Sequence, residues 1–379
     1  MTEAATLTIG VPWEIKDGEH RVALTPDGAH DLVDHSVRVL VEAGAGTESV
    51  IPDAEFAAVG AEIVADAATV WERADLVMKV KEPQPEELRH LRAGLVLFTY
   101  LHLAAYPEVA DALIASRVTA IAYETVQTAT GALPLLAPMS EVAGRLAPQI
   151  GARFLEKHEG GRGVLLGGAP GVRPGRVVVI GAGNLGWNAA WIAQGMEAEV
   201  VLLDKDLDRL RTVDQIHRGR IVTLASNRGA VARAVAEADL VVGAVLVPGG
   251  RAPVVVTERM VRAMRPGAVI VDCAVDQGGS VETTRETTHD EPVYEAHGVS
   301  HYAVANIPAA VPSTSTYALT NATLPYAREL AIHGLAGAVA ADPALALGVN
   351  TIDGVITNPA VADALGREVT PVDEALARR

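Results

Sequence analysis

The feature that most constrains this chain is a glycine-rich stretch at residues 177–186, VVVIGAGNLG, followed by an acidic residue at Asp204. A run of apolar, mostly β-branched residues leads directly into Gly181, Gly183 and Gly186, and a helix-compatible segment comes next. Strand, glycine turn, helix, second strand and acid is the order that a dinucleotide-binding unit requires. The alternative is a glycine turn that binds nothing, and the strand before the motif and the acid after it favour binding.

Each motif position has an expected role. Gly181 permits the tight turn, Gly183 lets the backbone approach a pyrophosphate, and Gly186 lets helix and strand pack closely. Asn184 fills a variable position at the helix N-terminus, where free N–H groups attract phosphates, and we expect it to contact the cofactor.

Asp204 ends the second predicted strand, where a carboxylate can accept hydrogen bonds from the adenosine ribose. It would repel a 2′-phosphate, which favours NAD over NADP. The nearby cations Lys205 and Arg209 keep NADP open as an alternative.

Composition narrows the class of protein. The 379 residues carry a formal net charge of −16 and no basic block, which argues against nucleic acid or an anionic membrane as partner. The N-terminus lacks the basic and apolar regions of a signal peptide, and no apolar run is long enough to span a membrane. A single cysteine, Cys273, excludes an internal disulfide and indicates a reducing compartment. We therefore expect a soluble cytoplasmic protein, with Cys273 a buried strand residue rather than a reactive thiol.

The fold class is predicted from short β-branched runs that alternate with Ala-rich helical stretches, a pattern typical of parallel α/β sheets. An echo between residues 74–77 and 238–241, both reading ADLV, suggests that two doubly wound, Rossmann-like domains share a topology. The expected strands are residues 7–11, 37–41, 76–80, 95–98 and 119–122 in one set, and 177–180, 200–204, 240–245, 268–272 and 300–304 in the other.

Two long helical segments are expected to join the domains across a cleft. The first opens at Ser140 as N-cap, and the second covers roughly residues 315–334. The predicted domains are residues 1–134 with 313–379, which bind substrate, and residues 135–312, which bind NAD.

Ligands of doubly wound sheets bind beyond the carboxyl ends of the strands. Arg21, Lys81, His102 and Asp276 all follow predicted strands, so they would share one cleft if the two sheets faced each other. Because Lys79 and Lys81 share one face of an extended segment, spacing alone does not choose between them.

Each of these residues also has a structural alternative. Arginine and lysine in loops are usually solvated surface charges, His102 could be a hydrogen-bonded core histidine, and Asp276 before Gln-Gly-Gly could form a turn. Their shared position at the ligand edge favours a catalytic cleft. Arginine and lysine would hold a small carboxylate, histidine would move a proton, and aspartate would orient water. A metal site is not expected, because His102 has no second ligand at metal spacing.

Longer segments resemble alanine dehydrogenase in order along nearly the whole chain. These segments are residues 9–12, 21–26, 79–83, 99–103, 122–127, 137–145, 243–248, 276–279 and 315–321. The departures are small: Ile307 stands where methionine is common, and Arg209 stands where lysine is common.

The resemblance implies NAD-dependent, reversible oxidative deamination of L-alanine to pyruvate and ammonium. It implies Arg21 and Lys81 as substrate ligands, which favours Lys81 over Lys79, and His102 with Asp276 as the acid/base pair. It also implies a homohexamer. Beyond the glycine motif, the expected cofactor contacts are Ser140, Asp204, Arg209, Ser226, Val245, Leu246, Cys273, Val304, Asn306 and Ile307.

Two other functions remain open from the sequence. The chain also resembles the NAD-binding subunit of a proton-translocating transhydrogenase, and a third possibility is a non-catalytic NAD-sensing module. Neither would need the cations and histidine of the first domain.

Overall fold

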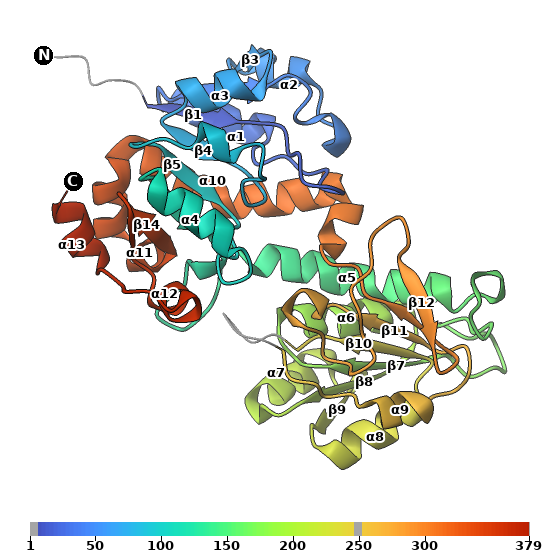
Figure 1. Ribbon diagram of the computed structural model, residues 1–379. Coiled ribbons are helices and arrows are strands. Elements are labelled where there is room, and N and C mark those ends of the chain that lie inside the picture. Colours follow the sequence, from blue (N-terminus) through green and yellow to red (C-terminus); the bar gives the residue numbers. More distant parts are fainter. Residues whose placement is uncertain (1–6, 246–251, 379) are drawn as a thin grey trace, which may run out of the picture. The chain divides into compact units, whose positions relative to one another are not determined.

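The chain folds into two compact units, shown in the computed structural model of Figure 1, which describes residues 7–245 and 252–378. Unit 1 comprises Met1–Pro138 and Val311–Arg379, and unit 2 comprises Met139–Ala310. These divisions lie within four residues of the predicted boundaries at 134/135 and 312/313.

Unit 1 contains an eight-stranded sheet in the order β15-β14-β6-β5-β4-β1-β2-β3. Strands β1 to β6 pair in parallel, whereas β14 pairs antiparallel with β6 and with β15. The C-terminal part of the chain thus extends a sheet that the N-terminal part begins (Figure 1). The strands are β1 (Thr8–Val11), β2 (Arg38–Glu42), β3 (Glu62–Val64), β4 (Leu76–Met78), β5 (Val96–Thr99), β6 (Thr119–Ala122), β14 (Val349–Ile352) and β15 (Val355–Ile356).

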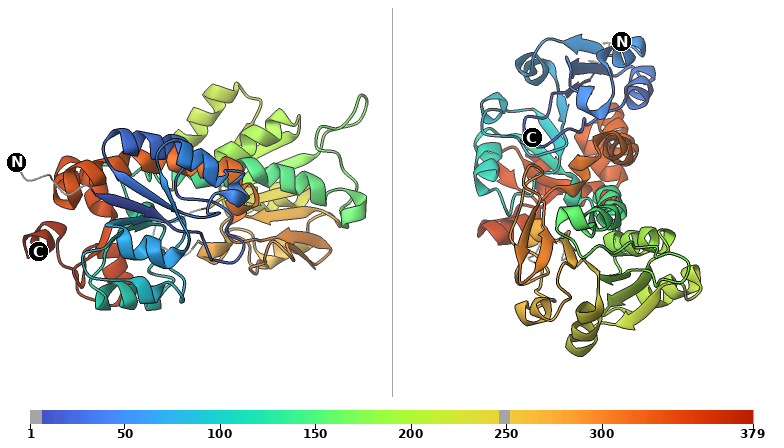
Figure 2. Two further views of the ribbon diagram at one scale, coloured as in Figure 1. Left: turned by 90° about the horizontal axis from the view of Figure 1, so that it is seen from above. Right: turned by 90° about the vertical axis from the view of Figure 1, so that its right-hand side faces the viewer.

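Helices cover both faces of this sheet. In Figure 2, left, α1 and α10 lie on one face, while α3 and α4 lie on the other. Trp71 of α3 and Leu113 of α4 belong to the buried hydrophobic cluster on that second face. The helices are α1 (Pro26–Asp34), α2 (Asp53–Ala58), α3 (Ala67–Arg73), α4 (Pro107–Ala115), α10 (Pro312–Ala341), α11 (Pro343–Gly348), α12 (Pro359–Leu365) and α13 (Val372–Ala377).

Unit 2 contains a seven-stranded sheet in the order β12-β13-β11-β10-β7-β8-β9, in which only β12 runs antiparallel. The central strands are buried and rich in β-branched residues, as expected for a sheet covered on both faces. The strands are β7 (Arg176–Ile180), β8 (Glu199–Asp204), β9 (Val222–Ala225), β10 (Leu240–Gly243), β11 (Val269–Asp272), β12 (Val293–Ala296) and β13 (Val299–Tyr302).

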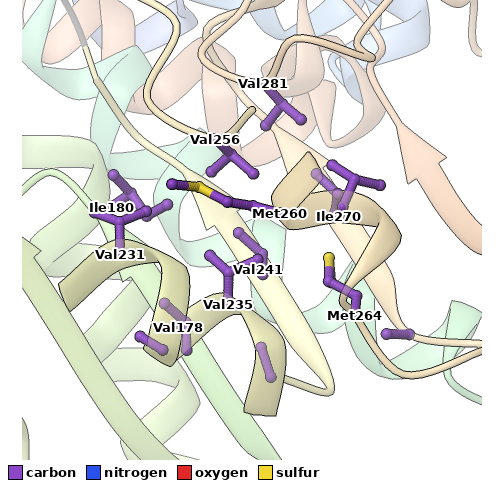
Figure 3. Close-up of a cluster of buried hydrophobic side chains, with 14 of the residues drawn as sticks. Val178, Ile180, Val231, Val235, Val241, Val256, Met260, Met264, Ile270 and Val281 are labelled. Carbon is purple, nitrogen blue, oxygen red and sulfur yellow. The ribbon is translucent and has the colours of Figure 1, made fainter. Parts of the chain in front are cut away.

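One hydrophobic core cluster of unit 2 lies between one face of this sheet and two helices. Figure 3 shows Val178, Val241 and Ile270 of the sheet packed against Val235 of α8 and Met260 of α9. Helices α5 and α6 lie on the opposite face (Figure 1). The helices are α5 (Ala137–Phe154), α6 (Asn184–Gly195), α7 (Leu207–His217), α8 (Arg228–Glu237) and α9 (Glu258–Arg262).

The α/β class and the two doubly wound sheets are confirmed, and all ten expected strands are present with ends shifted by up to two residues. Sequence reasoning missed β3, β9, β12, β14 and β15. These strands are short, β9 is largely exposed and β12 is half-buried, so their apolar pattern is weak.

The two long helices match the prediction in part. Helix α5 begins at Ala137, so the prediction of Ser140 as N-cap was wrong, and Ser140 lies inside the first turns. Helix α10 is interrupted at Gly334, whose φ of 66° is non-helical, close to the predicted end. That these helices join the domains across a cleft stays a prediction. No helix within the described residues is long and apolar enough to cross a membrane.

Candidate functional site

The glycine turn of unit 2 has the geometry that the motif predicts. Gly181 adopts φ +107°, which disfavours any residue with a Cβ, and a Cβ on Gly186 would overlap the carbonyl oxygen of Gly181. A Cβ on Gly183 would meet only the Arg209 Nη1 atom, at 3.8 Å, so the backbone there is open to an approaching group. Helix α6 begins at Asn184, with Gly183 as N-cap. This cradle fits a pyrophosphate at a helix N-terminus.

Asp204 closes the side of the turn. It is the last residue of β8, and its Oδ2 accepts a hydrogen bond from the Ala182 N–H at 2.6 Å, while Oδ1 accepts from the Asp206 N–H at 2.8 Å. Arg209 places Nη1 4.0 Å from Asp204 Oδ2. Asp204 is thus fixed beside the glycine turn, and the Arg209 guanidinium lies close to the Asp204 carboxylate.

The other expected cofactor residues of unit 2 follow strand ends at the same edge of the sheet, with one exception. Ser226 follows β9, and its N–H donates to the Asp204 carbonyl at 2.8 Å. Ser140 is the exception, because it lies in α5. Leu246 lies outside the described residues. The remaining residues after strand ends are Val245 after β10, Cys273 after β11, and Val304, Asn306 and Ile307 after β13.

The prediction that Cys273 is a buried strand residue was wrong. Strand β11 ends at Asp272, and Cys273 is a half-buried free thiol in the following turn. Desolvation, together with Asp272 and Asp276, raises the pKa of this thiol, so it stays protonated at neutral pH. Its position and protonation fit a cofactor contact better than a nucleophile.

Asp276 is exposed and lies in a short turn (Val275–Gln277) that a buried carboxylate organises. Asp272 is completely buried and accepts hydrogen bonds from the backbone N–H groups of Ser280 and Val281, at 2.9 and 3.1 Å, and from the Thr284 hydroxyl at 2.8 Å. These bonds close the loop that carries Asp276.

In unit 1 the loop between β1 and α1 carries Arg21, which is 2% exposed. Its guanidinium Nε donates to Glu19 Oε1 at 2.6 Å, and a second nitrogen pairs with the other carboxylate oxygen. Burial opposes the charge, yet Glu19 raises the pKa of Arg21 above its ordinary value. Arg21 is therefore a fixed, permanently charged group.

The structure separates Lys79 from Lys81. Lys79 is completely buried, with its Nζ 3.1 Å from Glu14 Oε2 and 2.8 Å from Glu87 Oε1, so its charge is neutralised inside the unit. Lys81 is half-buried and forms no ion pair with any residue that the structure describes. Burial and the neighbouring Arg21 lower the pKa of Lys81. Arg21 already pairs with Glu19, whereas Lys81 beside it has no carboxylate partner among the described residues, so the arrangement favours a further anion next to Lys81.

His102 follows β5 in an uncommon backbone conformation, with φ 47°. The His102 ring stacks on Tyr100 with 5.8 Å between the ring centroids, and the His102 backbone N–H donates to Glu124 Oε1 at 2.6 Å. Arg21, Lys81 and His102 thus all lie at the carboxyl edge of the unit 1 sheet. Asp276 belongs to unit 2, so the fold of unit 1 does not itself bring it to them.

Sequence reasoning did not single out two carboxylates that hold this site together, Glu14 and Glu124. Glu14 accepts hydrogen bonds from the Val80 and Lys81 N–H groups, at 2.5 and 3.4 Å, so it fixes the backbone that carries Lys81. The one available signal was position, because each carboxylate follows a strand at the ligand edge.

Comparisons with known proteins agree with this arrangement. Residues 10–143 match the family model described as alanine dehydrogenase/PNT, N-terminal domain, and residues 147–359 match the corresponding C-terminal domain. An alanine dehydrogenase of Bacillus subtilis is 57% identical over 98% of this chain and 98% of its own length.

Solved structures give the same result for the fold. An L-alanine dehydrogenase superposes with a TM-score of 0.92 at 49% identity, covering 95% of this chain and 99% of that one. A transhydrogenase from Sinorhizobium meliloti superposes with a TM-score of 0.80 at 25% identity, covering 93% and 99%.

Proposed function

The chain belongs to the alanine dehydrogenase/PNT family, and we propose that it catalyses the NAD-dependent, reversible oxidative deamination of L-alanine to pyruvate and ammonium. The observation that carries this proposal is the pair of cations at the edge of unit 1. Lys81 lies beside Arg21 and, within the described residues, no carboxylate neutralises it as Glu14 and Glu87 neutralise Lys79, so a substrate carboxylate would supply the missing negative charge.

The residues of unit 2 fit NAD, since the glycine turn forms a cradle that a Cβ would fill and Asp204 stands beside it. Gly181, Gly183, Asn184 and Gly186 would hold the pyrophosphate, and Asp204 would accept from the ribose hydroxyls. When bound, NAD supplies the hydride acceptor.

The chain's own residues do the rest of the work in the proposed mechanism. Arg21 binds the alanine carboxylate with two parallel donors, and Lys81 contributes a point charge to a second oxygen. Once these cations orient the substrate, His102 takes a proton from the reacting amine or hydroxyl. Asp276 orients the water that attacks the imine carbon, after which ammonia departs.

The test measures NADH formation from L-alanine and NAD at alkaline pH. We expect turnover by the intact chain and a loss of roughly 100- to 10,000-fold in kcat for His102→Ala, the range typical of a general acid–base residue. If the variant kept its fold and near wild-type kcat, the acid/base assignment would be wrong.

The transhydrogenase alternative predicts another outcome. It would give no NADH with alanine, but hydride exchange with NADPH in the presence of a membrane partner. Under that function, replacing Arg21 or Lys81 would leave exchange unchanged, since no substrate carboxylate needs them.

We further propose that the protein acts in the cytoplasm as a homohexamer, as the family resemblance implies. Light scattering on the purified protein is expected to give the mass of six chains, and a monomer mass would contradict this.

A further inference from the structure

His102 is held in a conformation that a residue with a side chain seldom adopts. Its φ of 47° lies in the left-handed region, which residues other than glycine seldom adopt for steric reasons. Such backbone strain persists only where surrounding contacts impose it, and it clusters at functional sites. The contacts that impose it here can be named.

The carboxylate of Glu124 makes the most direct of these contacts. Oε1 accepts from the His102 N–H at 2.6 Å, and both oxygens accept from the Leu101 N–H, at 3.3 and 3.2 Å. Two consecutive backbone N–H groups therefore point at one carboxylate, as in the anion-binding concavities that successive N–H groups form.

The sheet places Glu124 where it can do this. Strands β5 and β6 are parallel neighbours in which Thr99 pairs with Ala122, so the residues that follow them emerge side by side. Glu124 lies in the short 3-10 helix η3 (Tyr123–Thr125) directly after β6. The position of Glu124 is thus set by the register of β5 and β6, and Glu124 in turn holds the segment after β5 that carries His102.

Other contacts secure the remaining parts of His102. Its carbonyl accepts from the N–H groups of Ala105 and Tyr106, at 2.8 and 3.3 Å. Its ring stacks nearly parallel to Tyr100, with 7° between the planes, and the Tyr100 hydroxyl donates to the Leu135 carbonyl at 2.6 Å. Among these contacts, only that of Glu124 comes from a charged side chain.

We propose that Glu124 is the positioning residue for His102, holding the Leu101 and His102 N–H groups so that the imidazole stands where the proton transfer requires it. The inference rests on the proposed function, because it assigns a supporting residue to the same site. Glu124 has no assigned contact with substrate or cofactor and acts through His102.

The experiment compares Glu124→Ala, Glu124→Gln and His102→Ala, singly and as the double variant Glu124→Ala/His102→Ala. Glu124→Ala is expected to lower kcat about 10- to 100-fold, the range for displacing a catalytic group by about 1 Å, with KM for L-alanine changed less than threefold. Glu124→Gln keeps an oxygen that can accept from both N–H groups, so it is expected to restore kcat to within about fivefold of the unmodified chain.

The double variant gives the decisive measurement. If Glu124 acts through His102, adding Glu124→Ala to His102→Ala lowers the residual rate by no more than about twofold, because the group it positions is already absent. Glu108→Ala, in the exposed first turn of α4, is the matched control and is expected to leave kcat unchanged. The NADH affinity of every variant, measured by fluorescence titration, is expected to match the parent.

A full 10- to 100-fold loss on top of His102→Ala would overturn the inference, and so would a Glu124→Gln variant as slow as the alanine variant. If Glu124→Ala fails to fold, Glu124→Ser, which also removes the carboxylate, takes its place both alone and in the double variant with His102→Ala. Unchanged kcat in His102→Ala would refute the proposed acid/base role itself. Loss in His102→Ala with unchanged kcat in Glu124→Ala would refute only the positioning role.

Discussion

The sheets of the two units share the order of six strands, but the connection that follows the central strand differs at the edge where ligands of such sheets bind. Counted from the edge strand β3 of unit 1 and the edge strand β9 of unit 2, the order β3-β2-β1-β4-β5-β6 corresponds to β9-β8-β7-β10-β11-β13. The agreement extends to single hydrogen bonds. Asp75 before β4 accepts from the Thr8 N–H at 2.8 Å, and Asp239 before β10 accepts from the Arg176 N–H at 2.9 Å.

The acid at the end of the second strand is also shared. In unit 1, Glu42 accepts from the Trp13 N–H at 2.7 Å, and in unit 2, Asp204 accepts from the Ala182 N–H at 2.6 Å. Each acceptor is the last residue of its strand and accepts from the N–H two positions after the central strand, which is β1 in unit 1 and β7 in unit 2. An acid at this position is therefore not sufficient for a nucleotide site.

The difference lies in the connection that follows the central strand. In unit 2 it is the short turn of residues 181–183, which leaves a helix N-terminus open. In unit 1 it is the long loop of residues 12–25, which fills the edge with charged side chains such as Glu14 and Arg21. One topology thus supplies a cradle for phosphates in one unit and a set of fixed charges in the other.

Exchanging glycine for alanine at matched helix positions tests this difference most severely. Gly28 is the third residue of α1, the helix that follows β1, and Gly186 is the third residue of α6, the helix that follows β7. A Cβ on Gly186 would overlap backbone, whereas a Cβ on Gly28 would meet the movable Leu24 Cδ1 at 2.9 Å. We expect Gly186→Ala to lower NADH affinity more than about 100-fold or to unfold unit 2, and Gly28→Ala to change stability by at most about 1 kcal/mol.

Fluorescence titration with NADH and thermal unfolding measure both effects. Wild-type NADH affinity in Gly186→Ala would show that the glycine turn is not the nucleotide cradle. Unfolding of unit 1 in Gly28→Ala would show that the start of α1 tolerates a Cβ no better than the start of α6.

The buried charges of unit 1 predict a pH effect. Desolvation outweighs the nearby Lys79 and raises the pKa of Glu14 from 4.5 to about 7. Between these values the folded chain holds a proton that the unfolded chain has released. The contribution of Glu14 to the unfolding free energy therefore falls as pH rises, by about 3 kcal/mol in total. Glu14→Gln is expected to remove this dependence, as judged by urea unfolding at pH 4.5 and pH 7.5.

Glu62 is the matched control with the opposite sign. Hydrogen bonds from Arg73 and Arg38 lower its pKa to about 2, so its contribution is present above about pH 4.5 and is lost as pH falls toward 2. Glu62→Gln is therefore expected to leave the slope between pH 4.5 and 7.5 unchanged. Equal slopes in the parent and in Glu14→Gln would contradict the assignment to Glu14.

The two strand-end acids predict a smaller effect on cofactor choice. Asp204→Asn is expected to lower kcat/KM with NAD about 10-fold, as for loss of one charged hydrogen bond, and to raise the NADP/NAD ratio. Glu42→Gln in unit 1 is expected to leave that ratio unchanged. Initial rates with both cofactors measure it, and a shift caused by Glu42→Gln would break the functional distinction between the units.

The smallest expected effect concerns the shared aspartates. Asp239 is buried and also pairs with Arg162 Nη1 at 2.7 Å, whereas Asp75 is exposed. Asparagine can still accept the backbone N–H at either position. Asp239→Asn should therefore lower stability by about 1 kcal/mol more than Asp75→Asn, because it leaves Arg162 without its partner. Thermal unfolding measures this difference, and equal losses would mean that the Arg162 pair contributes nothing.

Much of this comparison was accessible from the sequence. The repeated ADLV segments marked the fourth strand of each unit, and the glycines marked the turn, because both depend on local pattern and backbone conformation. Local pattern failed where pairing partners are distant. Strand β14 is stabilised by its ladder with β6, more than 200 residues earlier, and its own sequence, VNTI, is half polar and gave no strand signal.

The sequence by itself determined the fold class, the cofactor turn and the strand ends at which Arg21, Lys81 and His102 lie. Periodicity is a property of neighbouring residues, and it left Lys79 and Lys81 equivalent on one face of an extended segment. Tertiary structure distinguished them, because burial against Glu14 and Glu87 neutralises Lys79, whereas none of the residues that the structure describes forms such a pair with Lys81. It also decided the backbone of His102, since the carboxylate that holds it arrives from the neighbouring strand.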